Sequence, residues 1–243
     1  MATYRALVEY DGTDYFGFQR QLSQPTVQGQ LETAIKVVAN QQTTVIGAGR
    51  TDRGVHASGQ VIAFEVEWRH EEPALQRALN ANLPEDIAVR DLEEAPQGFH
   101  PRFSARRRAY AYRIYSGAIR SPLRRRRAWH VSRRLDVSKM NQAARAIIGR
   151  HDFGTFGQPP QGTNTERQVF KAAWRRSDEL LIFEIEANAF LYRMVRSLVG
   201  SMKAVGEGRW TLADFEHALA TKDRSQAAKT APPQGLCLMA VHY

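Results

Sequence analysis

The sequence predicts an α+β fold, because strand-like and helix-like segments follow one another along the 243 residues without simple alternation. Runs rich in β-branched and aromatic residues, such as residues 4–10 and 109–115, have the character of strands. Apolar residues at helical spacing, such as those within residues 27–38, indicate helices. We therefore expect mixed sheets covered by helices rather than a regular βαβ array.

The first half is expected to contain strands and two helices. Residues 4–10 alternate and then meet Asp11 and Gly12, which is typical of a strand that ends in a turn. Thr26 is a candidate N-cap for the helix that follows it. The other expected elements are a short strand at residues 43–46, a strand at residues 55–64, a helix from Pro73 to about Ala81, and a strand at residues 87–92.

The second half partly echoes this order and begins near Ala105, before a basic run. We place the boundary at Ser104, which gives an N-terminal domain of residues 1–104 and a C-terminal domain of residues 105–243. Thr211 and Asp214 form a possible capping box for the last helix. The expected elements are a Tyr-rich strand at 109–115, a helix over 140–148 that ends at Gly149, a mobile loop at 158–165, paired strands at 168–174 and 180–187, a long helix at 189–205, and a closing strand at 236–241.

The charge of the chain favours a nucleic-acid partner. Its formal net charge is +9, and its 34 basic residues comprise 6 Lys and 28 Arg. Arginine binds phosphate through a planar fork of donors and stacks on bases, so an Arg-rich surface suits RNA or DNA. The alternative interpretation is a composition biased by genome or growth temperature.

Other features limit the classes of protein that the sequence allows. Cys237 is the only cysteine, which excludes an internal disulfide and a multi-Cys zinc site. His56, His100, His130 and His151 are scattered and show no close metal-ligand spacing, so we expect no catalytic metal. No apolar run is long enough to span a membrane, and residues 1–5 do not resemble a signal peptide, so a cytoplasmic protein is expected.

Residues 47–57, GAGRTDRGVHA, are the most informative segment for chemistry. Three glycines allow positive φ and close approach of the backbone to a ligand. Asp52 lies between Arg50 and Arg53, and neighbouring cations favour an ionised carboxylate. Asp52 is therefore a candidate nucleophile. The alternative is an aspartate that only stabilises a tight turn, with exposed arginines beside it.

Two further clusters lie in the second half. Tyr110, in the Tyr-rich strand, could stack on an unpaired base, although ordinary strand packing is the alternative. Arg193 and Arg196 lie three residues apart near Gly200, and could present guanidinium groups to a carboxylate or phosphate rather than to solvent. The basic run that includes Arg106 and Arg107 offers phosphate contacts, or is a solvated loop.

At these residues the sequence resembles the TruA family of tRNA pseudouridine synthases. Residues 47–57 are similar to the family's signature loop, and the resemblance extends over nearly the whole chain. The other segments that carry it are Tyr10-Asp11-Gly12-Thr13, residues 16–20, residues 79–84, Phe103-Ser104-Ala105, residues 110–115, His151-Asp152-Phe153, residues 188–196, and Gly235-Leu236.

The resemblance assigns roles to particular residues. It implies that Asp52 is the catalytic aspartate, that Arg50 is the base-flipping arginine, and that Tyr110 stacks on the target base. It implies that Arg196 forms an ion pair with the aspartate. The sequence departs from the family pattern at Arg53, where alanine is common, at Cys237, where an aromatic is frequent, and in the basic run 124–127.

The resemblance also implies the fold and the reaction. It implies two α/β-sandwich-like halves whose mixed, mostly antiparallel sheets join, a basic cleft between the halves, and a homodimer. The implied reaction converts uridine to pseudouridine at positions 38, 39 and 40 of the tRNA anticodon arm, without a cofactor. Asp52 could attack C1′ of the ribose, attack C6 of the uracil, or remove a proton from the sugar.

Two other classes of protein account for parts of the pattern. A nucleic-acid hydrolase would usually need paired carboxylates or a metal, and the key loop supplies one aspartate. A non-catalytic RNA-binding module would explain the charge and the tyrosines. It would give no reason for a carboxylate in a basic loop, because a carboxylate repels phosphate.

Overall fold

The computed structural model describes all 243 residues as two compact units of α+β structure, which confirms the predicted fold class. Unit 1 comprises residues 1–106 and 237–243, and unit 2 comprises residues 107–236. The structure thus assigns residues 237–243 to the first unit, whereas the sequence analysis placed them in the second domain. The reason is a long-range strand pairing that local sequence does not reveal.

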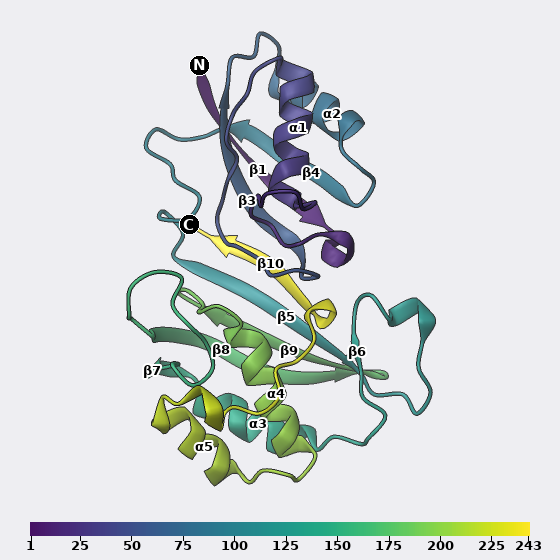
Figure 1. Cartoon of the computed structure of the whole chain (residues 1–243), viewed down its shortest axis with the longest axis vertical. Coiled ribbons are helices and arrows are strands. Elements are labelled where there is room, and N and C mark those ends of the chain that lie inside the picture. The colour runs from purple at the N-terminus through teal and green to yellow at the C-terminus, as the bar shows by residue number, and fades with distance from the viewer. The chain divides into compact units, whose positions relative to one another are not determined.

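The sheet of unit 1 has the strand order β4-β1-β3-β10, and α1 and α2 cover one of its faces (Figure 1). Strands β1, β3 and β4 are antiparallel, whereas β10 pairs parallel with β3 through Cys237–His56 and Leu238–Ala57. The short strand β2 also pairs with β3. The elements are β1 (Ala2–Tyr10), α1 (Val27–Ala39), β2 (Ile46–Gly47), β3 (His56–Val66), α2 (Glu72–Asn82), β4 (Ile87–Glu94) and β10 (Leu236–His242).

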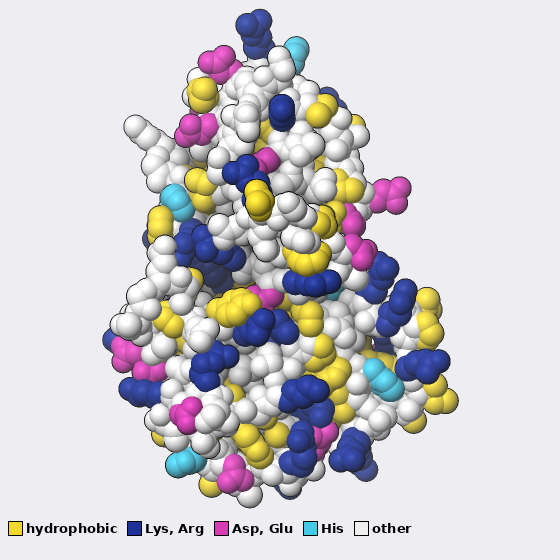
Figure 2. Space-filling model, viewed as in Figure 1, with side chains coloured by type: hydrophobic (Ala, Val, Ile, Leu, Met, Phe, Trp, Pro, Cys, Tyr) yellow, Lys and Arg dark blue, Asp and Glu magenta, His cyan; other side chains and the backbone are white.

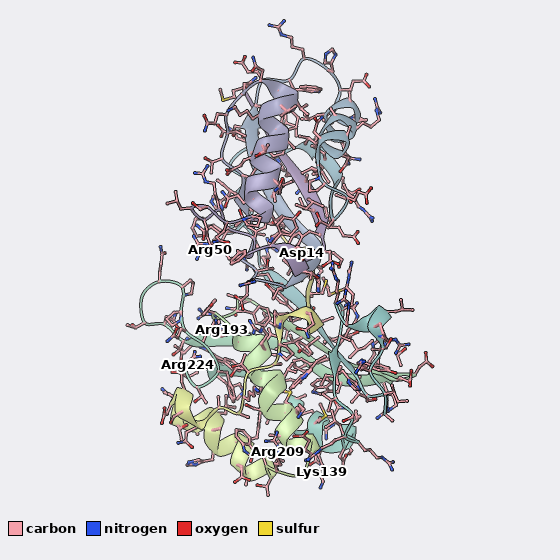
Figure 3. All side chains as sticks on the ribbon, turned by 45° about the vertical axis from the view of Figure 1, so that its right-hand side comes forward. Asp14, Arg50, Lys139, Arg193, Arg209 and Arg224 are labelled. Carbon is pink, nitrogen blue, oxygen red and sulfur yellow. The ribbon has the colours of Figure 1, made fainter.

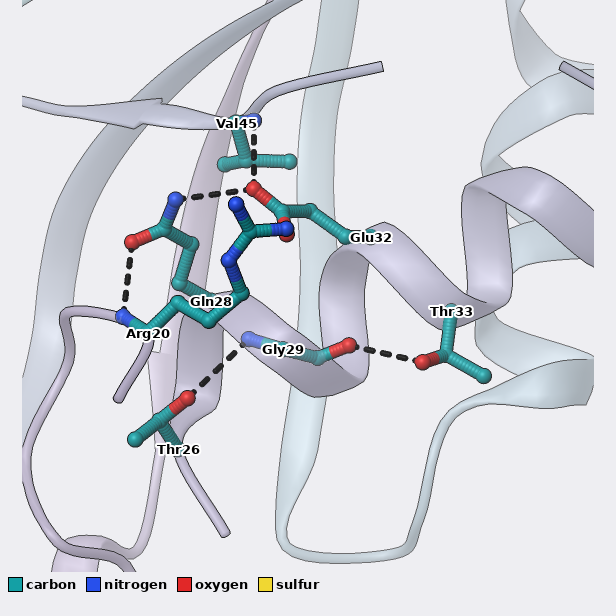
Figure 4. Close-up of polar contacts among 7 residues, drawn as sticks. All are labelled: Arg20, Thr26, Gln28, Gly29, Glu32, Thr33 and Val45. Carbon is teal, nitrogen blue, oxygen red and sulfur yellow. Dashed lines mark hydrogen bonds and ion pairs between the residues drawn. The ribbon is translucent and has the colours of Figure 1, made fainter. Parts of the chain in front are cut away.

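The sequence explains where α1 begins and how it is held. Thr26 Oγ1 accepts a hydrogen bond from the Gly29 amide, as the predicted N-cap should (Figure 4). Glu32, on the first turns of the helix, accepts from the amide of Val45 and forms an ion pair with Arg20 (Figure 4). These contacts fasten the chain before and after α1 to the helix.

Unit 2 has an antiparallel sheet of order β5-β9-β8-β7, with β6 parallel to β5. Helix α3 packs on β8 and on α4, and Trp174 stacks on Phe183 with ring centroids 5.0 Å apart in the core. The elements are β5 (Arg107–Tyr115), β6 (Trp129–His130), α3 (Val137–Ala146), β7 (Gly149–Asp152), β8 (Glu166–Ser177), β9 (Leu180–Ala187), α4 (Met194–Gly206) and α5 (Leu212–Thr221).

Several local predictions are confirmed, and others are wrong at their ends. The capping box of Thr211 and Asp214 forms at the start of α5. The helix expected at residues 189–205 begins only at Met194, because Arg193 adopts the left-handed conformation with φ of 63°. The helix expected to reach residue 148 ends at Ala146, and of the expected strand at residues 43–46 only Ile46 is in a strand.

Candidate active site

The loop that carries Asp52 connects β2 to β3 in unit 1. Asp52 is half-buried, and Arg50 is exposed. Of the three glycines, Gly54 has a positive φ of 76°. Gly47 is needed for a different reason, because a Cβ there would come 2.5 Å from the ring of Phe18.

Side chains from β1 and β3 hold the part of the loop that precedes Asp52. The Gln60 side chain donates to Gly49 O at 2.8 Å and accepts from the Gly49 amide at 3.2 Å. The Tyr10 hydroxyl and Thr51 Oγ1 share a buried hydrogen bond of 2.7 Å. Because Gln60, Tyr10 and Thr51 are all buried, the backbone next to Asp52 is fixed by groups that exclude water.

The segment of residues 11–18 forms a second support. The Phe18 amide donates to Thr51 O at 3.1 Å. On the other side of Asp52, the Gly54 amide donates to Tyr15 O at 3.3 Å. The Gly12 amide donates a hydrogen bond to Nδ1 of the buried His56 at 3.1 Å. The Asp52 loop is therefore tied to residues 11–18 before and after the carboxylate.

Tyr110 lies on β5 of unit 2, opposite Ile185 of β9. Its ring meets Phe190 edge to face, with centroids 5.0 Å apart, and 8% of the residue is exposed. Tyr112, two residues along, is buried completely and donates its hydroxyl to Pro232 O at 2.8 Å. Burial raises the pKa of the Tyr112 phenol, and the charge of Arg196 opposes part of this rise, so Tyr112 stays neutral.

Arg196 lies in the first turn of α4, and its guanidinium is oriented by the chain near residue 231. Its Nε donates to Ala231 O at 2.8 Å, and the Ala231 amide donates to Arg196 O at 3.0 Å. Gly200, one turn further along α4, would place a Cβ 2.1 Å from Lys229 O. The space that this glycine leaves is thus filled by the backbone of the chain itself.

The remaining predicted arginines occupy more exposed positions. Arg193 lies at the start of α4 over the ring of Tyr192, 4.9 Å from its centroid, and Figure 3 shows it at that end of the helix. Arg107 forms an ion pair with Glu186 at 3.1 Å and lies over the Phe170 ring. Arg106 is exposed, and its amide donates to His242 O at 2.8 Å.

The predicted site residues therefore fall into two sets. Asp52, Arg50 and Arg106 belong to unit 1, and Figure 3 shows Arg50 at the same end of that unit as Asp14. Tyr110, Arg193, Arg196 and Arg107 belong to unit 2. On the face drawn in Figure 2, separate Lys and Arg side chains are spread over unit 2, with fewer acidic side chains among them.

Two further properties concern the whole chain. No three His, Cys, Asp or Glu side chains are grouped so that they could hold a metal ion. None of the five helices has the length and apolar character that crossing a bilayer requires.

Comparison with known proteins identifies the class of this protein. A family model described as tRNA pseudouridine synthase matches residues 6–104 and 143–243. The chain belongs to this family and is a pseudouridine synthase, which is an isomerase and neither a hydrolase nor a simple RNA-binding module.

Relatives narrow the family further. The chain is 41% identical to tRNA pseudouridine synthase A of Pseudothermotoga lettingae and 43% identical to that of Afipia carboxidovorans, over 100% of each chain. It is 45% identical to tRNA pseudouridine synthase A of Shewanella baltica over 97% of this chain and 91% of that protein. A solved Cbf5-Nop10-Gar1 complex overlaps 97% of this chain and 48% of its own chain, with a TM-score of 0.41 and 13% identity, which is too slight a likeness to add to the assignment.

The sequence analysis did not identify the residues that position the Asp52 loop. Tyr10, Thr51 and Gln60 were seen only as parts of strands or of the family pattern. Tyr10 and Gln60 could have been found, because each places a polar group among buried apolar residues of a strand. Such a buried hydroxyl or amide needs a hydrogen-bond partner.

Proposed function

We propose that this protein isomerises uridine to pseudouridine at positions 38, 39 and 40 of the tRNA anticodon arm, with Asp52 as its catalytic carboxylate. The observation that carries the proposal is a half-buried carboxylate in a loop that backbone hydrogen bonds anchor on both sides, in a chain that is 41–45% identical to tRNA pseudouridine synthases along their length. A rigidly held carboxylate suits attack at a defined atom, because little reorganisation is then needed in the transition state.

The proposed reaction breaks the N1–C1′ glycosidic bond, turns the uracil, and forms a C5–C1′ bond. The proton that leaves C5 and the proton gained at N1 balance, so the product is an isomer of the substrate and no cofactor is required. Asp52 can attack C1′ of the ribose, attack C6 of the uracil, or remove a proton from the sugar. Each of these roles requires the ionised carboxylate.

The other proposed site residues act on the base and on the aspartate. The target base must leave the stack, which costs a few kcal/mol. We assign Tyr110 to stacking on that base and Arg50 to filling the space it leaves. Arg196 pairs with Asp52 in a basic cleft between the two units. The hydrogen bond from Arg196 Nε to Ala231 O supports this role, because it fixes the guanidinium before substrate binds.

The proposal extends to assembly and location. We infer a cytoplasmic homodimer in which one tRNA contacts both subunits. Arg106, Arg107 and Arg193, together with the run of residues 124–127, would bind phosphates along the RNA backbone. Such contacts position the RNA but do not read its sequence.

The test is the release of tritium from C5-labelled uridine in tRNA, followed by nucleoside analysis of the product. Release from tRNA with uridine at positions 38–40, and none from the same tRNA with cytidine there, is the expected result. Strand cleavage, or tRNA binding without isomerisation, would contradict the proposed reaction. Release that survives the cytidine replacements would contradict the proposed positions.

A further inference from the structure

We propose that Arg53 is a substrate-binding residue, and that its guanidinium holds a backbone phosphate of the RNA next to the target uridine. Arg53 is exposed, and its guanidinium carbon lies over the ring of half-buried Phe16, 4.1 Å from the centroid. The inference rests on the proposed function in one respect, which is that RNA is the substrate.

The stacking contact leaves Arg53 suited to bind an anion. The Phe16 ring offers the guanidinium no charged acceptor, and the N–H donors of this group lie in its plane and point away from its edges. A phosphate accepts two such donors side by side. Three other arginines of unit 1 form ion pairs with glutamates instead: Arg5 with Glu93, Arg20 with Glu32, and Arg90 with Glu9.

The position of Arg53 is fixed relative to Asp52. Phe16 belongs to the segment that is tied to the Asp52 loop by the hydrogen bonds from Phe18 to Thr51 and from Gly54 to Tyr15. Gly17 tightens this contact, because a Cβ there would lie 2.7 Å from Thr51 O. The ring and the arginine that it supports therefore form part of the same rigid piece as the carboxylate, so a phosphate bound by Arg53 is placed at a constant distance from Asp52.

Charge explains why a phosphate contact is needed at this point. Unit 1 carries 10 Lys and Arg residues against 14 Asp and Glu residues, so its own field repels RNA. Asp52 adds to that repulsion where the RNA must approach most closely. Arg50 and Arg53 are the two cations of the loop, and the resemblance assigns Arg50 to the base stack. Arg53 is then the cation left to neutralise a phosphate.

The experiment compares Arg53→Ala with Arg69→Ala. Arg69 is an exposed arginine of the same unit that follows the opposite end of β3, so its removal changes the net charge equally. Affinity for tRNA is measured by filter binding at 50 mM and 200 mM salt. One phosphate contact makes affinity fall about threefold over this range. We therefore expect the loss of affinity between the two salt concentrations to be about threefold smaller in Arg53→Ala than in Arg69→Ala or the parent protein.

Two additional variants show whether a loss of tRNA affinity comes from the lost phosphate contact or from a disturbed fold. Arg53→Lys keeps the charge but loses the planar donors, and Phe16→Leu keeps an apolar side chain but loses the aromatic face. Each should weaken tRNA binding less than Arg53→Ala, with a melting temperature close to that of the parent. Phe16→Leu alone would leave Arg53 charged but no longer held in place.

A salt dependence of Arg53→Ala equal to that of Arg69→Ala overturns the inference. So does a fall in kcat with unchanged tRNA affinity, which would mean that Arg53 acts on Asp52 rather than on RNA. A parent protein that binds tRNA but releases no tritium overturns the proposed function while the salt dependence still decides the role of Arg53. A parent protein that binds no tRNA overturns both.

Discussion

The two units differ in charge and in what they contribute to the enzyme. Unit 1 has 10 basic and 14 acidic residues and unit 2 has 24 and 11, so their formal charges are −4 and +13. The proposed catalytic carboxylate lies in the acidic unit, and most of the charge that attracts RNA lies in the basic one. The basic residues that give unit 2 its positive potential are therefore different from the residues that hold the Asp52 loop in unit 1.

A substitution of Asp52 gives the largest expected effect, and it tests whether unit 1 supplies catalysis while unit 2 supplies RNA affinity. Asp52→Asn should lower turnover to below about one-thousandth of the parent, because the amide is not a nucleophile or base, a loss typical of such groups. Affinity for tRNA should stay largely intact, since the charges of unit 2 are unchanged. Tritium release and filter binding measure the two effects. Substantial residual turnover would remove Asp52 from the mechanism.

Arg196 should show the next largest effect. If it pairs with Asp52, Arg196→Ala removes the cation that orients a half-buried carboxylate, and kcat/KM should fall by about two to three orders of magnitude. Arg196→Lys should not restore activity, because lysine has no Nε–H to donate to Ala231 O. Arg193→Ala is the comparison, since that exposed side chain is assigned to phosphate binding and its removal should lower tRNA affinity more than kcat. Near-normal activity of Arg196→Ala in a folded protein would refute the pairing.

Tyr110 distinguishes stacking from proton transfer. Tyr110→Phe keeps the aromatic face and removes the phenol, so kcat should fall about 100-fold if the hydroxyl moves a proton. Tyr112→Phe is a matched control. It removes a hydroxyl that donates to Pro232 O and should cost about 1 kcal/mol of stability without a change in kcat. Equal turnover by Tyr110→Phe and the parent would limit Tyr110 to stacking.

The basic run of residues 124–127 tests how unit 2 binds RNA. Replacing these four arginines should flatten the dependence of log affinity on log salt by about 0.7–0.9 for each phosphate that the run no longer binds, with kcat on saturating tRNA little changed. Arg124 should contribute least, because it lies 3.7 Å from Glu179 and over the Tyr115 ring. An unchanged salt dependence would show that the run does not contact RNA.

A mixed dimer tests whether this contact comes from the other subunit. It combines Asp52→Asn in one subunit with the neutralised run in its partner, so the active Asp52 shares a subunit with the damaged run. Turnover is expected at half the parent rate per dimer if the run acts across the dimer. Impaired turnover by this mixed dimer at subsaturating tRNA, which a run acting within its own subunit would give, would contradict the proposed arrangement, and so would a monomer in light scattering.

The smallest expected effect is on stability, and it concerns Lys203 of unit 2, which forms an ion pair with Glu207. Glu207 is largely buried, which raises its pKa, but hydrogen bonds from Lys203 and Arg209 more than offset this and hold the pKa below its usual value of 4.5. The ion pairs of Glu207 therefore stabilise the fold above pH 4.5. This contribution is lost as the pH falls through the lowered pKa of Glu207. Lys203→Met should lower the melting temperature at pH 7 by a few degrees, and less at pH 3. Its tRNA salt dependence should equal that of the parent.

Local patterns predicted much of the fold because many of its elements are specified by neighbouring residues. The cap at Thr26 and the capping box at Thr211 are examples, since each is a contact between residues three apart. The start of α4 was missed because a left-handed arginine at residue 193 is not a local preference. The pairing of β10 with β3 was missed because it joins residues about 180 positions apart in the sequence.

The candidate site was predictable in its residues but not in its supports. Asp52 and Arg50 stand out as charges in a glycine-rich segment. Their setting depends on contacts across the fold, such as the hydrogen bond between Tyr10 and Thr51 and the stacking of Arg53 on Phe16. These pairs follow from how β1 and residues 11–18 pack against the Asp52 loop, which no spacing in the chain encodes. The meeting of Asp52 with Tyr110 and Arg196 stays a prediction.

The parallel pairing of β10 with β3 has a consequence for biosynthesis. Residues 237–243 complete the sheet of unit 1 beside His56, at the start of the strand that follows the Asp52 loop. Domains generally fold from the N-terminus as the chain leaves the ribosome, but here the unit that carries Asp52 lacks one of its strands until residues 237–243 have been made. A chain that stops before residue 237 would carry every proposed catalytic residue and still lack the strand that pairs with His56 and Ala57, directly after the Asp52 loop.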